Sequence, residues 1–321
     1  MTLLNSKIKS TIFLTDGGLE TDLIFNKNIS LPHFAAFPLV EDPKYQQVLN
    51  DYYREYMDIA AKQGTGFILE SPTWRANPDW GYKLGYSKED LMEINQSAIH
   101  QLKILKRIYT PKIKNIFISG QLGPRGDGYR TINTMTVNEA ANYHNLQIMA
   151  FKNSDVDLVT AITMNYSEEA LGITKAAKKS NLSVVISFTV ETDGNLPSGE
   201  TLKEAISKID KATNNYPIYY MINCAHPSHF INKINVDGSW KHRIKGVRAN
   251  ASCKSHAELD ESTELDKGDK TELGDWHTIL KKHLPNLAVY GGCCGTDSSH
   301  IQSICNYIMN PEHIKYLQSN S

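Results

Sequence analysis

The sequence predicts an α/β protein built as a single-domain (β/α)8 TIM barrel, and three observations lead to this fold class. Eight short apolar runs, rich in Ile, Val, Phe and Tyr, recur mostly without polar alternation, which is typical of strands buried on both faces. Stretches with helical spacing of apolar residues lie between many of these runs, and such alternation favours a parallel sheet. Eight strands are the number that closes this barrel, and 321 residues are near the upper end for one such domain.

Each predicted strand is a short apolar run that is followed by turn residues. Functional side chains of such a barrel are expected where the strands end and the βα loops begin. In chain order the runs are Ile12–Thr15, Gly66–Leu69, Ile116–Ser119, Leu158–Thr163, Val184–Phe188, Ile218–Ile222, Ile244–Val247 and Leu287–Tyr290.

The predicted helices are amphipathic stretches, and several of them begin behind an N-capping residue. Ser87 with Asp90, and Thr136 with Glu139, have the spacing of a capping box. The predicted ranges are Lys44–Lys62, Lys88–Ile108, Val137–Phe151, Glu168–Lys179, Leu202–Ile209 and Ser298–Met309.

An open, doubly wound parallel sheet is the rival architecture. The barrel is favoured over it because no G-x-G-x-x-G motif follows the first strand, and Gly17-Gly18 after Asp16 predicts only a tight turn.

Two segments depart from the alternation of strands and helices. Pro72–Tyr86 is rich in Trp and Tyr and is expected to form a long aromatic loop. Cys253–Asp275 has eight acidic residues against three lysines, so we expect a polar, solvated excursion at about residues 250–275. Because no stretch reads as a linker, the expectation is one domain over residues 1–321.

Composition excludes several classes of protein. Lys plus Arg is 34 and Asp plus Glu is 35, so the formal charge of −1 gives no electrostatic reason to expect nucleic acid or an anionic membrane as partner. No run approaches the roughly 20 apolar residues of a membrane span, and the first residues lack a secretory apolar run. Five cysteines are too few for a disulfide framework. We therefore expect a cytoplasmic, enzyme-sized protein.

Three cysteines follow predicted strands and form the candidate metal site. Cys224 ends the sixth strand, and Cys293 and Cys294 end the eighth. The carboxyl ends of these strands are separated by one strand only, so the three sulfurs are expected to meet. Three thiolates suit Zn²⁺ and leave its fourth position open, which is typical of a catalytic site.

Spacing alone leaves alternatives to zinc open. The vicinal pair Cys293-Cys294 could form a redox-active disulfide, and glycine-rich turns after the last barrel strands can bind phosphate. The other two cysteines, Cys253 and Cys305, are expected to be small buried hydrophobes. His226 and His229 are expected to lie in the loop after Cys224, lining the mouth or bonded to backbone, rather than to bind metal.

These residues resemble the zinc-dependent homocysteine S-methyltransferases, which include the enzymes that use S-methylmethionine or betaine. The paired-cysteine motif is the most specific part, and the resemblance spans Ile12 to about Ile308. The matching motifs are Gly291-Gly292-Cys293-Cys294-Gly295-Thr296, Asn223-Cys224, Thr15-Asp16-Gly17-Gly18 with Glu20-Thr21, Gly120-Gln121-Leu122-Gly123-Pro124 and Glu168-Glu169-Ala170.

The resemblance implies a barrel in which Cys224, Cys293 and Cys294 hold Zn²⁺. It also implies transfer of a methyl group from a sulfonium or ammonium donor, such as S-methylmethionine or S-adenosylmethionine, to the thiol of homocysteine, giving methionine. Asp16 matches a carboxylate near the substrate ammonium, and an Asx turn at the Gly-Gly bend is the alternative. Asn223 is expected to orient the thiolate or to fill the vacant metal position, and a plain strand-end hydrogen bond is the alternative.

One departure from the family concerns the carboxylate that binds the homocysteine ammonium. Family members carry Glu-Thr at the end of the fourth strand, whereas this chain has Ile162-Thr163. Thr163 is retained as a candidate substrate contact. Glu70, which ends the second strand, is hypothesised to replace the lost carboxylate, and an ion pair with Arg75 or Arg125 is the alternative.

The aromatic loop supplies the remaining candidate. Trp74, with Trp80 and Tyr82, could form a wall for a methyl sulfonium, because cations sit well on indole faces, and ordinary loop packing is the alternative. The predicted function is thus a zinc-dependent homocysteine methyltransferase. Two rivals are a relative that acts on another thiol or selenol, and a thiol-based metal-binding or redox-sensing barrel without turnover.

Overall fold

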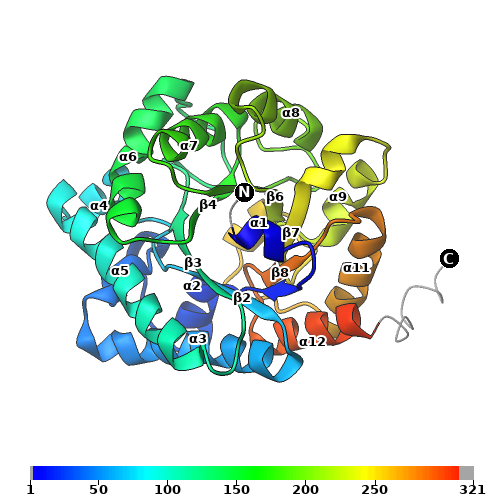
Figure 1. Cartoon of the computed structure of the whole chain (residues 1–321), viewed down its shortest axis with the longest axis horizontal. Helices are drawn as coiled ribbons and strands as arrows, with labels where there is room; N and C mark the ends of the chain where they lie inside the picture. The colour runs from blue at the N-terminus through cyan, green and yellow to red at the C-terminus, as the bar shows by residue number, and fades with distance from the viewer. Residues whose placement is uncertain (1–2, 311–321) are drawn as a thin grey trace.

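The computed structural model describes residues 3–310, in which eight parallel strands close into a barrel surrounded by helices (Figure 1). Each strand pairs with the next along the chain, and β1 also pairs with β8. The (β/α)8 barrel is therefore confirmed. The strands are β1 Phe13–Leu14, β2 Gly66–Glu70, β3 Ile116–Leu122, β4 Leu158–Met164, β5 Val184–Phe188, β6 Tyr220–Asn223, β7 Ile244–Ala249 and β8 Val289–Gly292.

Helices cover the outside of the barrel, and their ends follow the capping chemistry of the sequence. Both predicted capping boxes form, at Ser87 and at Thr136. The helices are α1 Leu3–Lys7, α2 Leu19–Thr21, α3 Pro43–Gln63, α4 Pro78–Lys83, α5 Lys88–Tyr109, α6 Val137–Asn153, α7 Ser167–Lys179, α8 Leu202–Thr213, α9 Pro227–Ile234, α10 His256–Asp260, α11 Lys270–His283 and α12 Ser298–Met309, with a π turn at Asp22–Asn26 and 3₁₀ turns at Pro32–Phe34, Phe37–Val40 and Ser239–Arg243.

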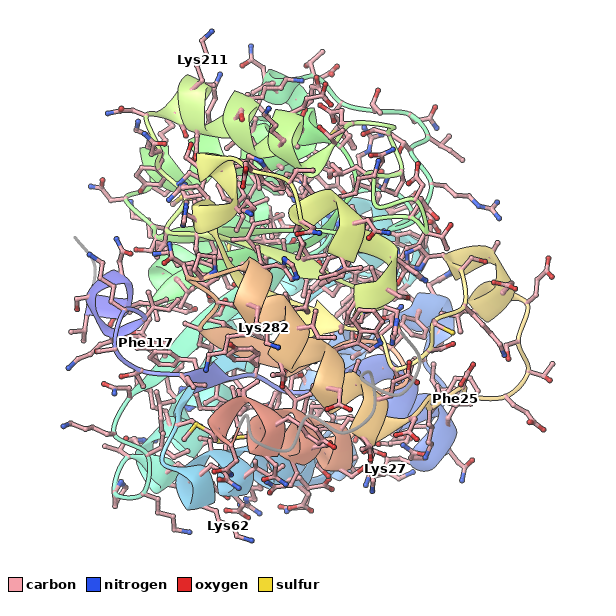
Figure 2. The ribbon with its side chains drawn as sticks, turned by 90° about the vertical axis from the view of Figure 1, so that its right-hand side faces the viewer. Phe25, Lys27, Lys62, Phe117, Lys211 and Lys282 are labelled. Carbon is pink, nitrogen blue, oxygen red and sulfur yellow. A yellow bond between two sulfur atoms is a disulfide. The ribbon has the colours of Figure 1, made fainter. Side chains whose placement is uncertain are left out.

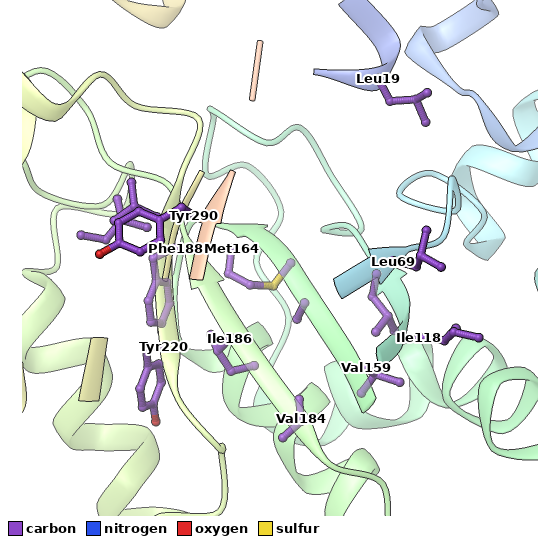
Figure 3. Close-up of a cluster of buried hydrophobic side chains, with 14 of the residues drawn as sticks. Leu19, Leu69, Ile118, Val159, Met164, Val184, Ile186, Phe188, Tyr220 and Tyr290 are labelled. Atoms are coloured by element: carbon purple, nitrogen blue, oxygen red, sulfur yellow. The ribbon is translucent and has the colours of Figure 1, made fainter. Parts of the chain in front are cut away.

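The core has two parts. The larger part packs the strands against the helices, and Figure 3 shows a portion of it around Ile186 and Tyr220. The smaller part includes Phe13 and Phe117 and is completed by Leu4 and Ile8, from α1 and the turn after it. Figure 1 shows α1 lying across one end of the barrel. The site is therefore left to the other end, where the strands finish.

Charged side chains lie on the outer faces of the helices. Figure 2 shows Lys62 and Lys211 pointing away from the barrel, and Lys282 on α11 is exposed. Within residues 3–310, no helix combines the length and the apolar character that crossing a bilayer requires.

Two predicted loops contain more structure than the sequence suggested. The aromatic segment after β2 includes the short helix α4, which Asn77 caps. The acidic segment contains α10 and the first turns of α11, and His256 within it is only 8% exposed. The expectation of a wholly solvated excursion was therefore wrong, because His256 stacks on Tyr129 with ring centroids 3.9 Å apart.

The two cysteines outside the candidate site differ from each other. Cys305 is buried in α12, as expected, whereas Cys253 is exposed. The prediction of burial for Cys253 was wrong because the residue lies on the outward side of the acidic segment.

Candidate active site

Three cysteine sulfurs meet where β6 and β8 end. The Sγ atoms of Cys224, Cys293 and Cys294 all lie within 4.8 Å of one another. Cys224 is buried, and the other two are half-buried. Within residues 3–310, no other group of His, Cys, Asp and Glu side chains gathers in this way. The predicted convergence of two distant segments is therefore present.

The end of β7 holds both cysteine segments in place. The Cys224 amide donates to the Arg248 carbonyl at 3.1 Å, and the Cys293 amide donates to the Ala249 carbonyl at 2.8 Å. Because β7 lies between β6 and β8, its last two carbonyls fix the backbone on each side. Convergence of the sulfurs thus follows from the strand order.

Two residues at this end have left-handed backbone conformations. Cys224 has φ 52° and Thr163 has φ 62°, an uncommon region for residues other than glycine and an outlier for a β-branched one. The two are neighbours, since Thr163 Oγ1 lies 3.9 Å from Cys224 Sγ. Strain of this kind persists only where the surroundings enforce it, and it is concentrated at functional sites.

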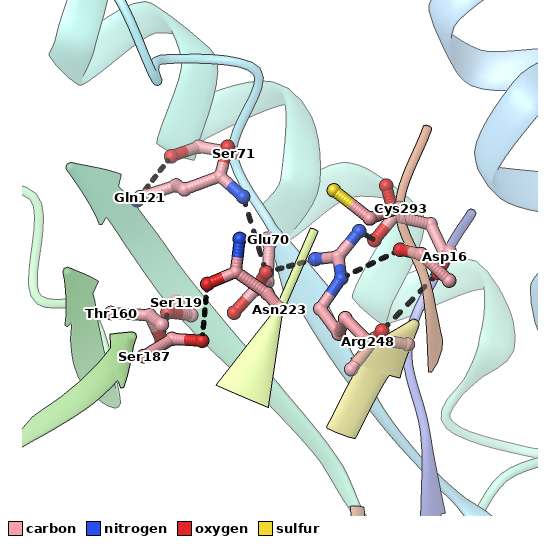
Figure 4. Close-up of polar contacts among 12 residues, drawn as sticks. Asp16, Glu70, Ser71, Ser119, Gln121, Thr160, Ser187, Asn223, Arg248 and Cys293 are labelled. Atoms are coloured by element: carbon pink, nitrogen blue, oxygen red, sulfur yellow. Dashed lines mark hydrogen bonds and ion pairs between the residues drawn. The ribbon is translucent and has the colours of Figure 1, made fainter. Parts of the chain in front are cut away.

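Asn223 enforces this geometry through three hydrogen bonds. Its Oδ1 accepts from Ser187 Oγ at 2.6 Å (Figure 4). The same oxygen accepts from the Thr163 amide at 3.0 Å, and the Nδ2 of Asn223 donates to Thr163 Oγ1 at 2.9 Å. Asn223 therefore joins β6 to β4 and β5 and positions Thr163 beside Cys224. A direct role of Asn223 toward a thiolate stays a prediction.

Glycine is required at the end of β8 for close packing. A Cβ on Gly291 would overlap Thr15 Oγ1, and a Cβ on Gly292 would overlap Thr296 Oγ1. These two glycines let β8 and the following turn approach the first strand, which brings Cys293 beside the Asp16 segment.

The sulfur cluster fits a soft metal ion in its reduced form. In this structure Cys224 and Cys293 are joined as a disulfide, and Cys294 is not part of it. The alternative pairing of Cys293 with Cys294 is thus not formed. Sulfur donors from three residues on one side of a cavity suit Zn²⁺, and the described residues place no His or carboxylate in the cluster.

A cavity of about 530 Å³, measured to its open mouth, lies against the cluster. We call it the cysteine pocket, since all three cysteines line it. The predicted substrate residues that line it are Asp16, Glu70, Trp74 and Thr163, together with Ile162. Asn223 does not line it.

A buried ion triad also lines this pocket. The guanidinium of Arg248 pairs with Asp16 Oδ1 at 2.8 Å and with Glu70 Oε2, and it donates to the carbonyls of Gly17 at 2.9 Å and Gly292 at 3.0 Å (Figure 4). Each of the three residues is 4% exposed. Removing one member of such a buried network is costly, because it leaves another charge buried without a partner.

Arg248 was missed by the sequence analysis. The expected partners of Glu70, Arg75 or Arg125, were wrong, since Glu70 pairs with Arg248. The Asx turn considered for Asp16 is also not formed, because the Gly18 amide that such a turn would use donates to the Thr296 carbonyl at 3.1 Å. The sequence did contain one signal for Arg248. Glu70 is a charged residue at the end of a strand, and such a residue implies an opposite charge at the end of another strand.

Asp16 and Glu20, two acidic residues that line the pocket, have raised pKa values. Burial raises the pKa of Asp16 to about 6, and the Arg248 guanidinium opposes this rise. Burial raises the pKa of Glu20 to about 7. A cationic group of a substrate would lower both pKa values again, because an opposite charge favours the carboxylate form. The pocket is thus suited to bind a cation.

The aromatic side chains of the segment after β2 are arranged around Arg75. Its Cζ lies 4.3 Å from the Trp74 ring centroid and 3.6 Å from that of Trp80. Trp80 does not line the cysteine pocket, and Tyr82 is 82% exposed. Only Trp74 of the three aromatics reaches the pocket, and its contact with a sulfonium stays a prediction.

The two histidines after Cys224 are bonded as expected. His226 Nδ1 accepts from the Ser228 amide at 3.3 Å at the start of α9, and His229 Nε2 donates to the Cys253 carbonyl at 2.8 Å. Neither belongs to the sulfur cluster.

Comparisons with known proteins agree with this geometry. A family model described as homocysteine S-methyltransferase matches residues 13–308. Homocysteine S-methyltransferase 1 of Brassica oleracea var. italica is 21% identical over 314 residues, which cover 91% of each chain. The crystal structure of the metallated homocysteine methyltransferase MmuM of Escherichia coli has a TM-score of 0.72 at 18% identity and covers 94% of this chain and 98% of its own. Its oxidised form has a TM-score of 0.71 at 16% identity and covers 94% and 97%.

Proposed function

The chain belongs to the homocysteine S-methyltransferase family and is a methyltransferase, and from this premise we propose that it moves a methyl group from an onium donor to homocysteine with the help of zinc. The observation that carries the proposal is the meeting of three cysteine sulfurs at the floor of a pocket that also holds buried carboxylates. The product is methionine.

Zinc is the ion we propose for the cluster, held by Cys224, Cys293 and Cys294. The donor set supports it, since three thiolates form a soft ligand set and the cysteine pocket opens on one side of them. When bound, zinc favours the deprotonated form of a substrate thiol at neutral pH. The disulfide between Cys224 and Cys293 must be reduced before the metal binds.

Glu70 is the carboxylate we propose for the homocysteine ammonium. Its Oε2 is used by Arg248 and by Gln121 Nε2 at 3.2 Å, whereas its Oε1 makes no hydrogen bond with residues 3–310. Both oxygens of Asp16 are used, by Tyr52 and Arg248. Asp16 then acts mainly by orienting Arg248 and by adding negative charge near the ammonium.

The chemical step is an in-line displacement at the methyl carbon. The substrate sulfur forms a bond to this carbon while the bond from the carbon to the donor sulfur or nitrogen breaks, and the electron pair leaves with the neutral donor. The protein contributes by aligning the two substrates, which is worth several kcal/mol in reactions of this kind. Thr163 and Cys224, held by Asn223, keep one wall of the pocket rigid for this alignment.

A different thiol or a selenol is the second candidate acceptor. Ile162, which lines the pocket in place of the family carboxylate, favours it, because an apolar side chain there cannot bind an ammonium. The same transfer would then occur on an acceptor without that group.

A methyl-transfer assay on the reduced, zinc-loaded protein tests the proposal. Homocysteine is offered with S-methylmethionine, S-adenosylmethionine and betaine in turn, and selenohomocysteine and a simple alkyl thiol serve as rival acceptors. We expect methionine with at least one donor and about one zinc per chain, the zinc being lost in Cys224→Ser. Cys305→Ser, a buried cysteine in α12, is the matched control and should keep its zinc. A metal-free wild-type protein, or methylation of the rivals only, would contradict it.

A further inference from the structure

A second cavity adjoins the cysteine pocket, and the methyl transfer to homocysteine does not explain its polar groups. Thr21, Phe34, Trp74, Tyr129 and Cys294 line both cavities. The second cavity, which we call the outer pocket, is otherwise formed by Arg75, Asp127, Gly295, the turn at Ile24–Phe25 and parts of residues 250–266. Figure 2 shows Phe25, one of its lining residues, near the outside of the molecule.

Arg75 is the unusual residue of the outer pocket. Its side chain is buried, with 9% exposed, and its Nε and Nη1 atoms have no hydrogen-bond partner. No ion pair within 4.0 Å and no hydrogen bond joins its guanidinium to any residue of the described range 3–310. The guanidinium lies against the indole faces of Trp74 and Trp80.

An arginine in this state is a binding group that lacks its ligand. Burial lowers the pKa of Arg75 to about 10, against the nearby Asp127, so the group stays charged at neutral pH. Leaving buried donors unbonded costs free energy, and most buried donors in native proteins are bonded. The flanking indoles hold the planar guanidinium in one orientation, which prepares it for a carboxylate.

Two further polar groups of the same pocket also lack partners. Trp74 Nε1 and Asn250 Oδ1 are buried and make no hydrogen bond within the described part of the chain. Asn250 is 2% exposed. A ligand with an anionic end and a cationic or polar end could bond to all three groups. The anionic end would accept from the arginine and the indole N–H, and the other end would donate to the amide oxygen.

We propose that Arg75 binds the carboxylate of the methyl donor in the outer pocket, so that the enzyme selects onium donors that carry a carboxylate. This proposal rests on the proposed function. Arg75 lines the outer pocket and not the cysteine pocket, so a ligand that it anchors is not the thiol acceptor. Cys294 lies on the wall that the two cavities share, so a donor held at Arg75 can direct its methyl group toward the acceptor sulfur.

Matched pairs of small onium compounds test this selection. S-methylmethionine is compared with its methyl ester, and betaine with choline, because the members of each pair differ in the carboxylate. Binding to the wild-type protein is followed by tryptophan fluorescence, since Trp74 and Trp80 flank the arginine. We expect at least one carboxylate compound to bind about 10- to 100-fold more tightly than its partner, the usual range for a hydrogen bond to a charged group.

The variants Arg75→Gln and Arg75→Lys assign this preference to the guanidinium. In Arg75→Gln the two members of the pair should bind within about threefold of each other, and Arg75→Lys should keep part of the preference. Lys83→Gln is the matched control, because exposed Lys83 also lies over the Trp80 ring, at 3.9 Å, but does not line the outer pocket. It should behave as the wild type. Circular dichroism checks that each variant is folded.

Failure of this inference is distinguishable from failure of the proposed function. Equal binding of both members of each pair by the wild type, or an unchanged preference in folded Arg75→Gln, would overturn the role of Arg75, whatever the turnover. A preference that depends on Arg75 without any methylation of homocysteine would support the role of Arg75 and count against the proposed function.

Discussion

Two arginines are buried at the same end of the barrel, and the fold treats them in opposite ways. Arg248 is 4% exposed and bonds to two carboxylates and two backbone carbonyls. Arg75 is 9% exposed and contacts two indole faces without a hydrogen bond or an ion pair in residues 3–310. Removing a guanidinium from water costs free energy unless its N–H groups are bonded. The fold supplies these bonds to Arg248, whereas those of Arg75 are left for a ligand to supply.

The largest expected effect is the loss of stability in Arg248→Met. This change leaves Asp16 and Glu70 buried side by side without a cation, and the free energy of unfolding should fall by about 3–5 kcal/mol. Arg75→Met is the matched change and should lower it by less than about 2 kcal/mol, because it breaks no ion pair. Urea denaturation of both variants measures the difference. Equal losses would show that the contrast between the arginines is wrong.

The next effect concerns the triad as a binding site. Glu70→Gln should weaken homocysteine binding by about 10- to 100-fold, because a charge-assisted hydrogen bond to the ammonium is lost. Adding Ile162→Glu should restore part of the affinity, since Ile162 lines the same pocket. Calorimetric titration with homocysteine measures both, and Glu168→Gln, whose carboxylate pairs with Lys208 at the surface, is the control. Unchanged affinity in Glu70→Gln would remove Glu70 from the site.

The third prediction concerns His277, a buried base that, unlike the two arginines, can lose its charge by releasing a proton. His277 is fully buried, its Nε2 has no partner, and burial lowers its pKa to about 4. The unfolded chain protonates near pH 6.5, so the stability of the wild type relative to His277→Phe is constant above that pH and falls as the pH drops toward 4.

The size of this pH effect follows from the shift. At pH 5 the wild type should have lost about 2 kcal/mol relative to His277→Phe, compared with the same difference at pH 7.5. Urea denaturation at the two pH values gives the numbers. If the difference between the two proteins does not change with pH, His277 binds its proton equally well in the folded and the unfolded protein, and burial does not lower its pKa.

The strands were predictable because burial on both faces leaves a local signal. Val184–Phe188 was predicted with the bounds that the structure has. The ends were less predictable: Glu70 and Arg248 extend β2 and β7 beyond their apolar runs, since in the fold their charges are paired across the barrel. From hydropathy alone, such charged residues are predicted to lie in the loops that follow the strands.

The meeting of the three cysteines was predictable and their surroundings were not. Cys224, Cys293 and Cys294 carry a distinctive motif after strands whose order brings them together. Arg248 lies 178 residues from Glu70, so no local sequence pattern predicts that the two side chains form an ion pair. The isolation of Arg75 is a property of what surrounds it in space, and only coordinates reveal that a charged side chain has no partner.

The smallest expected effect applies the same contrast to two asparagines. Asn223 makes three hydrogen bonds that join three strands, and Asn223→Ala should cost about 1–3 kcal/mol because it leaves the Thr163 amide buried without a partner. The Asn250 side-chain oxygen is buried without one, so Asn250→Ala should change the free energy of unfolding by less than about 1 kcal/mol. Urea denaturation compares the two. If the free energy of unfolding falls as much in Asn250→Ala as in Asn223→Ala, unbonded polar groups at this end of the barrel stabilise the fold. The unbonded state of Arg75 would then no longer indicate a ligand-binding role.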